Sequence, residues 1–167
     1  MLIYKFAFTM LFKSLILSAA LIITNQLSSQ NMSYIFVGRY KYPSEIIYSY
    51  DGKHLYSGRY NYIEKILYTF DGKHIYKGRY PYLESVLYTW DGEFLYKGRY
   101  NYQSEIKLMW DGKYIYAGRY PYIDKILYTL DKDFLYEGRY NYFDKIRYTL
   151  EGNIPMPLIM LFELGLI

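Results

Sequence analysis

Residues 71–90 read DGKHIYKGRYPYLESVLYTW, and this 20-residue stretch recurs along the chain. Units in the same register start at Asn31, Asp51, Asp71, Asp91, Asp111 and Asp131. Every unit has Gly-Arg-Tyr at positions eight to ten, Tyr at position twelve, and Ile or Val at position sixteen. A fixed period of this kind is typical of a repeat architecture, in which each copy is one supersecondary unit.

Each unit contains two runs of β-branched and aromatic residues joined by Asp-Gly, as in residues 85–90 and 93–100 on either side of Asp91 and Gly92. Two such runs separated by Asp-Gly predict a β-hairpin. The second connection between runs starts with Asn or Pro in the last five units, and both residues favour turns. Short links join antiparallel neighbours, so we expect an all-β antiparallel meander of about twelve strands in residues 31–150, without helices.

The Asp-Gly pair is compatible with a two-residue type I′ turn or with a three-residue loop that ends in a bulge. We favour the bulged loop, because it places Ile66, Tyr68, His74 and Tyr76 on one face of the hairpin. Thr69 then lies on the other face, with Leu67, Ile75 and the lysines. Lys132 replaces the Gly in one unit, and we expect the loosest turn there.

Two architectures remain open for the meander. The hairpins can close into a ring, flower or barrel that hides its edges, or they can form an open single-layer sheet. An open repeat sheet normally has divergent capping units. The first unit differs only mildly, with Asn31-Met32 in place of Asp-Gly and Phe36 in place of Tyr, and this favours closure. Residues 151–167 begin a seventh unit that becomes an apolar tail, which can be a closing strand, a cap or divergent sequence.

The first 30 residues predict a signal peptide. Lys5 and Lys13 precede the apolar stretch 15–23, and residues 24–33 are polar and small, which is the three-part pattern of an export signal. An uncleaved membrane anchor is the alternative, although Lys13 interrupts the apolar stretch that a spanning helix requires. We therefore expect a secreted, periplasmic or cell-surface protein, with membrane contact only if this segment is retained.

The charge balance argues against nucleic acid as a partner. Without Lys5 and Lys13, 18 of the 20 basic residues remain beside 16 acidic residues, and the two signs are interspersed. A protein that binds phosphate backbones is expected to show a basic face. The 26 tyrosines predict a core made largely of aromatic rings, and they can also present hydroxyl groups to a partner.

The sequence contains no recognisable catalytic or cofactor site. There is no Cys, and no phosphate-binding, nucleophile-elbow or zinc-protease motif occurs. The two histidines, His54 and His74, occupy the same repeat position on hairpins about 9.6 Å apart, which is too far for one metal ion. Elsewhere this position is aromatic, so we interpret both as packing residues and expect neither metal, cofactor nor enzymatic activity.

The Arg of Gly-Arg-Tyr is the most notable polar feature, because six copies in register form a stripe. A structural interpretation has each guanidinium contact neighbouring rings and an acid of the next turn, such as Glu64, Glu84 or Asp124. A functional interpretation makes the stripe, with the tyrosines at position twelve, a multivalent binding face. Candidate binding residues are Arg39, Arg59, Arg79, Arg99, Arg119, Arg139, Tyr62, Tyr82, Tyr102 and Tyr122.

The Asp71-Gly72 pair followed by Tyr76-x-Gly78-x-Tyr80 resembles the membrane occupation and recognition nexus (MORN) repeat over about half of each unit. The unit departs from that repeat by one extra residue before the Tyr and by lacking a Gly-rich second half. It also resembles the units of small exported bacterial proteins, including beta-flower proteins and repeat proteins described as fibronectin-binding. These resemblances imply an all-β binding or structural role and transfer no catalytic residue.

Together these features predict a non-catalytic, secreted or surface binding module whose repeated Tyr and Arg face engages a protein, such as an extracellular-matrix protein, or a glycan. The alternative is a purely structural protein whose identical hairpins make a rigid, self-associating layer.

Overall fold

The computed structural model describes residues 32–167, in which twelve strands follow one another as an antiparallel meander. The signal-peptide or anchor prediction falls on residues that lie outside this range. The strands are β1 (Ser33–Val37), β2 (Ile46–Tyr50), β3 (His54–Ser57), β4 (Ile66–Phe70), β5 (His74–Lys77), β6 (Val86–Trp90), β7 (Phe94–Lys97), β8 (Ile106–Trp110), β9 (Tyr114–Ala117), β10 (Ile126–Asp131), β11 (Phe134–Glu137) and β12 (Ile146–Glu151).

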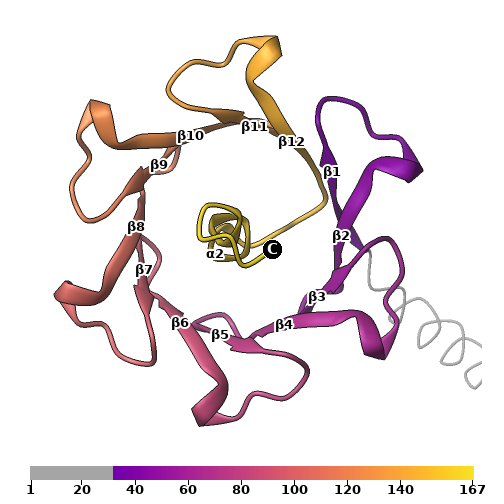
Figure 1. The fold of residues 1–167 in the computed structure, drawn as a ribbon, viewed down its shortest axis with the longest axis vertical. Coiled ribbons are helices and arrows are strands. Elements are labelled where there is room, and N and C mark those ends of the chain that lie inside the picture. The colour runs from indigo at the N-terminus through magenta and orange to yellow at the C-terminus, as the bar shows by residue number, and fades with distance from the viewer. Residues whose placement is uncertain (1–31) are drawn as a thin grey trace, which may run out of the picture. The chain divides into compact units, whose positions relative to one another are not determined.

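The meander closes into a barrel, because β12 pairs with β1 in addition to β11. Figure 1 shows the resulting ring with six outward projections. The predicted all-β meander is therefore confirmed, and of the two architectures the closed one is correct. Closure satisfies the backbone groups of both terminal strands, which would otherwise be exposed edges open to pairing with other chains.

The first and last strands, β1 and β12, pair to form the sixth hairpin of the ring, which no turn connects. Across this seam Gly38 N–H donates to the Arg147 carbonyl at 2.8 Å, as Gly78 N–H does to Leu67 inside the chain. Lys41, which stands where other units have Asn or Pro, places its Nζ 3.1 Å from Asp133 Oδ2 and 3.8 Å from Glu151 Oε2. The repeat pattern of hydrogen bonds therefore continues across the seam, and one exceptional residue adds ion pairs to it.

The hairpin register differs from the one that we favoured. Phe70 pairs with Ile75 and Thr69 pairs with Tyr76, and Asp71 N–H reaches the His74 carbonyl at 3.3 Å, so Gly72 and Lys73 form the tip. The predicted assignment of faces is wrong. Tyr68 joins Ile75 in the barrel core, whereas Thr69 shares the outer side with Tyr76. Asp71 Oδ1 accepts the Lys73 and His74 N–H groups and so caps this tip, but the same register recurs at the Lys132 turn without such a cap.

The Lys132 turn departs from the other described hairpin turns, but the strand pairing there runs one pair further, to Asp131 and Phe134, so the expected loosening is not seen in the strand pairing. Lys132 has a φ of 55°, and it is the only non-glycine residue with positive φ in residues 32–167. Asp131 there accepts a hydrogen bond from the Asn141 side chain at 3.1 Å, in place of the turn amides that its counterparts bind. The turn therefore lacks the carboxylate cap that closes the Asp71 turn.

The barrel interior contains aliphatic as well as aromatic side chains. Position five of each unit supplies a fully buried Ile or Leu, namely Ile35, Leu55, Ile75, Leu95, Ile115 and Leu135. Each such side chain contributes about 1.5 to 3 kcal/mol of burial free energy. Rings at positions eighteen and twenty, such as Tyr68 and Phe70, extend this core toward the two ends. The expectation of a core made largely of rings is therefore only partly correct.

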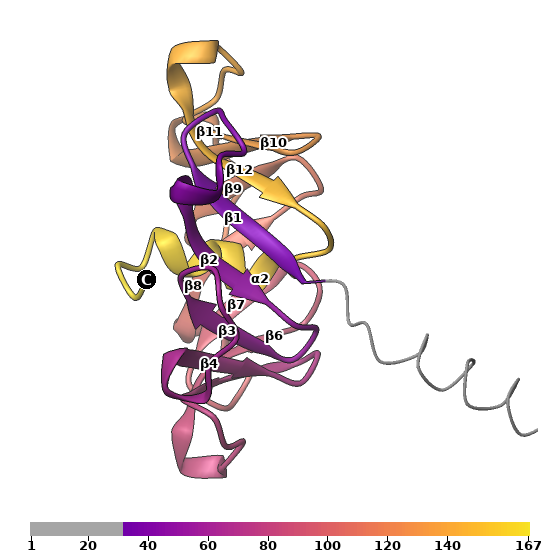
Figure 2. The same ribbon diagram turned by 90° about the vertical axis from the view of Figure 1, so that its right-hand side faces the viewer.

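The apolar tail fills the interior of the barrel. After β12 the chain turns inward and forms α2 (Met156–Ile159) and the 3-10 helix η7 (Met160–Phe162), and Leu158 to Leu161 are at most 2% exposed. Figure 2 shows the tail passing through the barrel to leave the C-terminus at the end opposite the hairpin turns. Phe162 stacks on Tyr148 with ring centroids 4.1 Å apart. Within residues 32–167, no helix is long and apolar enough to cross a membrane.

A buried threonine at position nineteen connects four of the six hairpins to the loop that follows, whereas the other two units have Ser49 and Met109 at this position. Thr69 Oγ1 donates to the Gly78 carbonyl at 2.7 Å, Thr129 does so to Gly138 at 2.7 Å, and Thr149 does so across the seam to Gly38 at 2.6 Å. Ser49 occupies the same position, is fully buried and has no hydrogen-bond partner for its Oγ. The unit that contains Ser49 therefore lacks a contact that the units on both sides of it make.

We predict that Ser49→Thr stabilises the protein. The γ-methyl restricts χ1 of the side chain, which favours the rotamer that aims the hydroxyl at the following Gly carbonyl. The recovered hydrogen bond should add about 0.5 to 1.5 kcal/mol to the free energy of unfolding measured in denaturant. Thr69→Ser is the matched reverse change and should lower it. An unchanged or lower stability of Ser49→Thr would show that this contact is not what Ser49 lacks.

Candidate functional site in the rim loops

Six loops project from one end of the barrel, and we call them the rim loops. They comprise residues 38–45, 58–65, 78–85, 98–105, 118–125 and 138–145. Each starts with the Gly of Gly-Arg-Tyr, whose φ lies between +68° and +80°, a range that favours glycine and directs the chain outward. Each ends in one turn of 3-10 helix, for example Leu83–Ser85, where Ser85 N–H donates to the Tyr82 carbonyl at 2.9 Å. The prediction that the repeat contains no helix is wrong at these short turns.

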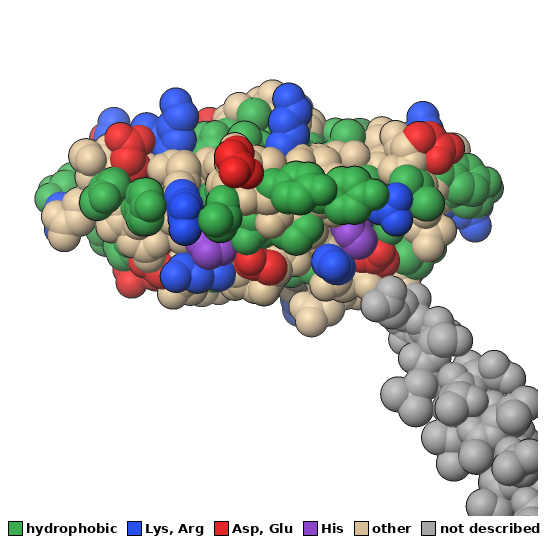
Figure 3. All heavy atoms as spheres, turned by 90° about the horizontal axis from the view of Figure 1, so that it is seen from below, with side chains coloured by type: hydrophobic (Ala, Val, Ile, Leu, Met, Phe, Trp, Pro, Cys, Tyr) green, Lys and Arg blue, Asp and Glu red, His purple; other side chains and the backbone are tan. Residues whose placement is uncertain are grey.

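Two tyrosines lie side by side in every rim loop. The rings at positions ten and twelve, such as Tyr80 and Tyr82, have centroids 5.5 to 5.7 Å apart in all six loops. Their exposed fractions range from 52 to 62%, although large rings are usually covered. Figure 3 shows hydrophobic side chains along the edge of the ring, with basic and acidic side chains between them. The rim therefore offers a repeated pair of accessible rings.

The Gly-Arg-Tyr arginine lies over the first ring of each pair. The distance from Arg Cζ to the ring centroid of the following Tyr is 5.2 to 5.7 Å in the six loops. All six arginines are exposed. At exposed sites a cation–π contact of this kind contributes only about 0.5 to 1 kcal/mol. The guanidinium is therefore held in place by its ring while its donors stay accessible.

The same arginines also reach back toward the preceding unit. Arg119 Nη1 donates to Gln103 Oε1 at 2.9 Å, and Arg39 lies 4.5 Å from the ring centroid of Phe143 across the seam. Arg59 lines a hollow of about 180 Å³ together with Phe36 of the first unit. These contacts support the interpretation that the arginine stripe connects neighbouring hairpins.

The acids that we expected to pair with the arginines do not do so. Among residues 32–167, none of the six rim-loop arginines lies within ion-pair distance of a carboxylate, and the one Arg–Glu pair joins Arg147 to Glu137 at 2.7 Å. The cause is the 3-10 turn, which carries acids such as Glu84 on a separate part of the loop. The ring contact of the structural interpretation is present, and the ion pair is not.

The structure places the predicted binding residues in groups of one arginine and one position-twelve tyrosine per loop. Arg79 and Tyr82 belong to the same loop, with Tyr80 between them in space, and the other loops repeat this order. Sequence reasoning omitted the position-ten tyrosines, together with Tyr42 and Tyr142. The Tyr-x-Tyr spacing within Gly-Arg-Tyr-x-Tyr could have indicated them, because alternate residues of an extended segment point the same way.

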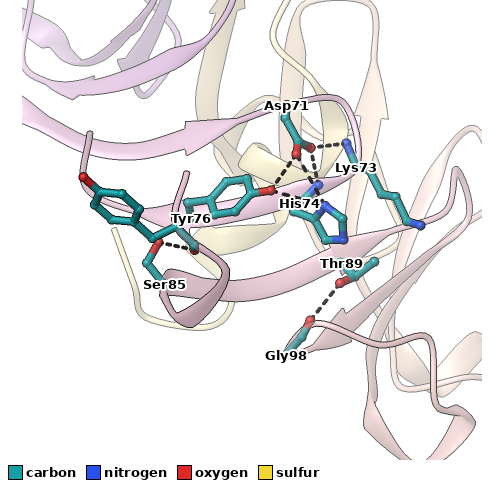
Figure 4. Close-up of polar contacts among 8 residues, drawn as sticks. Asp71, Lys73, His74, Tyr76, Ser85, Thr89 and Gly98 are labelled. Atoms are coloured by element: carbon teal, nitrogen blue, oxygen red, sulfur yellow. Dashed lines mark hydrogen bonds and ion pairs between the residues drawn. The ribbon is translucent and has the colours of Figure 1, made fainter. Parts of the chain in front are cut away.

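On the outer side of the barrel, the carboxylate of each capped Asp-Gly turn accepts a hydrogen bond from a tyrosine hydroxyl. Asp71 Oδ2 accepts the Tyr76 hydroxyl at 2.7 Å while its Oδ1 accepts the two turn amides (Figure 4). Asp51, Asp91 and Asp111 repeat this arrangement with Tyr56, Tyr96 and Tyr116. Burial opposes ionisation of the Asp71 carboxyl, but hydrogen bonds from the His74 amide, the Tyr76 hydroxyl and the Lys73 amide outweigh it and lower its pKa to about 2. Burial, with the hydrogen bond to Asp71, raises the pKa of Tyr76 to about 12.

We predict that the protein loses stability as the pH falls from about 5 to 2. A carboxyl whose pKa is lower in the folded than in the unfolded chain stabilises the fold above its unfolded pKa of about 3.9, and this contribution disappears as it becomes protonated. Four turn carboxyls have lowered pKa values. Denaturant unfolding at a series of pH values measures the slope. Asp71→Asn should reduce the slope, and an unaltered slope would contradict the assignment.

Both histidines belong to these turns. The Nδ1 atom lies 3.2 Å from Asp51 Oδ2 in His54 and 3.4 Å from Asp71 Oδ2 in His74, and each ring packs edge-on against the tyrosine two residues later. In the described part of the chain, no three His, Asp or Glu residues gather in a way that could hold a metal ion. The histidines therefore take the place of the aromatic residues found at this position elsewhere.

A comparison with protein families agrees with this architecture. The family model of the 6-fold beta flower protein matches residues 35–159, about three quarters of the chain. Neither the curated proteins nor the solved structures gave a match. The matched span runs from the first strand of the barrel into the tail helix α2, so it includes all six rim loops and the seam. The chain belongs to the 6-fold beta flower protein family.

Proposed function

We propose that the protein is a non-catalytic binding module, exported to the cell surface or the medium, which engages a protein or glycan partner through its rim loops. The observation that carries the proposal is the exposure of twelve tyrosines, in pairs, at 52 to 62%. Tyr combines a large ring with a polar hydroxyl and loses little conformational entropy on binding, and it is enriched at binding surfaces for these reasons.

The fold of the barrel does not depend on the tyrosines of the rim loops. The barrel is closed by strand pairing, its interior is filled by the tail, and the rim-loop tyrosines lie outside this core. Residues at position thirteen add further exposed apolar surface, with Ile63 at 61%, Ile123 at 64% and Phe143 at 71%. Exposed apolar surface commonly marks an interaction site where it is contiguous.

A self-associating structural protein is the second candidate function. The same exposed rings could pack against another copy of the chain, and six equivalent loops would then produce an extended assembly. Closure of the barrel argues against assembly through strand edges, because the first and last strands are already paired. Self-association would therefore have to use the rim loops themselves.

We predict that replacing Tyr62, Tyr82, Tyr102 and Tyr122 with serine weakens partner binding at least about 10-fold, because identical weak contacts act together through avidity. The free energy of unfolding should change little, since each exposed substitution is worth about 0.5 kcal/mol or less. Retention of the exported chain on immobilised fibronectin, collagen and polysaccharides measures binding, and sedimentation measures self-association.

The control for this experiment replaces Lys53, Lys73 and Lys113 at the hairpin turns with serine, which alters the opposite end of the barrel. Retention by one ligand class that is lost only in the tyrosine variant supports the binding module. A parent chain that is retained by none of the ligands and forms assemblies that the tyrosine variant cannot form supports the structural alternative. Unfolding of the tyrosine variant would contradict both, because the rings would then be structural.

A further inference from the structure

The repetition of the rim loops narrows the chemical class of partner that can bind them. This inference rests on the binding function proposed above. The six loops repeat the same Arg, Tyr and Tyr arrangement, with ring distances that agree within 0.2 Å from loop to loop. A folded protein presents one irregular surface and can match few of six identical sites. A polymer of identical units can match several at once, and the weak contacts then reinforce one another.

The chemistry of each loop fits a sugar ring that bears an anionic group. Exposed aromatic rings provide flat surfaces for the C–H faces of a pyranose, while tyrosine hydroxyls can bond to its hydroxyls. The guanidinium of Arg79 lies over Tyr80, is exposed, and has no carboxylate partner among the described residues. Its planar fork of N–H donors matches a carboxylate in a bidentate geometry.

The sixth rim loop contains a hollow that shows how such a group could be held. The hollow has a volume of about 350 Å³ and is lined by Glu137, Gly138, Arg139, Tyr140, Tyr142 and Lys145. Two cations and two rings therefore border one open space beside a single acid. The hollow is of the size of small-molecule sites, which begin at about 300 Å³.

The distribution of acids favours a polymer that is less densely charged than duplex nucleic acid. Each of the six 3-10 turns in the rim loops carries one carboxylate, such as Glu64, Glu84, Asp124 or Asp144, and none of these acids pairs with a rim-loop arginine. These acids would repel a dense row of phosphates, and binding of such a backbone requires a broadly basic surface. A polymer with one carboxylate per sugar can bind a loop that carries both a basic and an acidic side chain.

We propose that the rim loops bind an acidic polysaccharide, with a carboxylate-bearing sugar against the tyrosine pair and its carboxylate on the Gly-Arg-Tyr guanidinium. The flat rings and a guanidinium without a carboxylate partner are repeated around the rim, so successive sugars of one chain, or several chains, engage several loops. Neutral polysaccharides lack the group that the arginine would bind, and duplex DNA lacks the accessible sugar faces.

The test uses the full chain and a matched pair of ligands. Polygalacturonate carries a carboxylate on each sugar, and its fully methyl-esterified form has the same rings without the charge. We expect affinity electrophoresis in polygalacturonate to retard the parent strongly, and retardation in the esterified polymer or in duplex DNA to be at least about 10-fold weaker. Arg59, Arg99 and Arg139 are replaced together by glutamine, and Lys53, Lys73 and Lys113 are replaced together by glutamine as a control with the same loss of charge.

The proposal requires that the arginine variant lose at least about 10-fold in affinity for polygalacturonate while the lysine variant loses little. Equal losses of affinity in the two variants would mean that only net charge matters, and this result would overturn the proposal. If the esterified polymer binds equally well, the proposed recognition of a carboxylate is wrong, whereas the proposed binding function still holds. Binding of matrix proteins but of neither polymer would reject a glycan and keep the proposed function, whereas binding to none of these probes would reject both.

Discussion

A chain with Leu161 replaced by aspartate should lose most of its free energy of unfolding. Leu161 belongs to η7 in the middle of the barrel, is 0% exposed and is part of the buried core cluster formed with strand residues such as Leu55. Replacing leucine by a small residue in such a core already costs about 2 to 5 kcal/mol. An unpaired carboxylate adds a desolvation cost, and native domains have only about 5 to 15 kcal/mol in total. Denaturant unfolding followed by circular dichroism measures the loss.

Leu166→Asp is the matched control, because the same change occurs five residues later at a side chain that is 36% exposed. It should cost far less, and Leu161→Met, which conserves volume, should cost less than about 1.5 kcal/mol. The contrast between Leu161 and Leu166 distinguishes a tail inserted in the barrel from a tail that merely adheres to it. Equal and small effects at both positions would mean that the tail does not fill the barrel.

The variant Gly152→Ala should be destabilised by about 2 to 5 kcal/mol, the sum of a left-handed backbone and a steric overlap. Gly152 has a φ of +83° at the start of the tail, and a Cβ there would lie 2.5 Å from Ser33 Oγ and 2.9 Å from Ser33 Cβ. The displaced Ser33 hydroxyl also accepts the Asn153 N–H at 2.9 Å. The seam would therefore open where the tail leaves β12. Thermal or denaturant unfolding measures the effect.

Gly72→Ala separates the two causes, because Gly72 has a φ of +97° and no atom within 4 Å of its added Cβ. It should show only the conformational cost, about 1 to 2 kcal/mol. In the Gly152→Ala background, Ser33→Gly should restore part of the stability by making space. If Gly152→Ala is no worse than Gly72→Ala, the close approach of Gly152 to Ser33 is not a constraint on folding.

The sequence was sufficient to predict the meander because every unit repeats the same local signals. Alternating strands, Asp-Gly turns and Asn or Pro links each point to antiparallel neighbours, and the nearly regular first unit pointed to closure. The register within each hairpin could not be read from the same residues. Leu130 pairs with Leu135 at the Lys132 turn just as Phe70 pairs with Ile75, although Asp131 caps no turn amide there, so the turn residues alone do not set the register.

The tail and the rim could be predicted only in part, for a different reason. An apolar run after Glu151 indicates burial, but a repeat alone does not show that closure leaves an interior for Leu158 to Leu161. In the rim loops, the identical Gly-Arg-Tyr triplets indicated a structural contact, and Arg79 does lie on Tyr80. The exposed partner ring was missed at position ten because identity among repeats does not distinguish buried from exposed tyrosines.

The most direct test of six equivalent sites is a nuclear magnetic resonance titration with digalacturonate, followed at the glycine amides. Gly38, Gly58, Gly78, Gly98, Gly118 and Gly138 each report on one rim loop, whereas Gly52, Gly72, Gly92 and Gly112 report on hairpin turns at the opposite end of the barrel. Six equivalent sites predict that all rim-loop glycine resonances shift with similar midpoints while the turn glycines stay in place. Shifts at the turn glycines, or at a single rim loop alone, would contradict a binding face repeated around the rim.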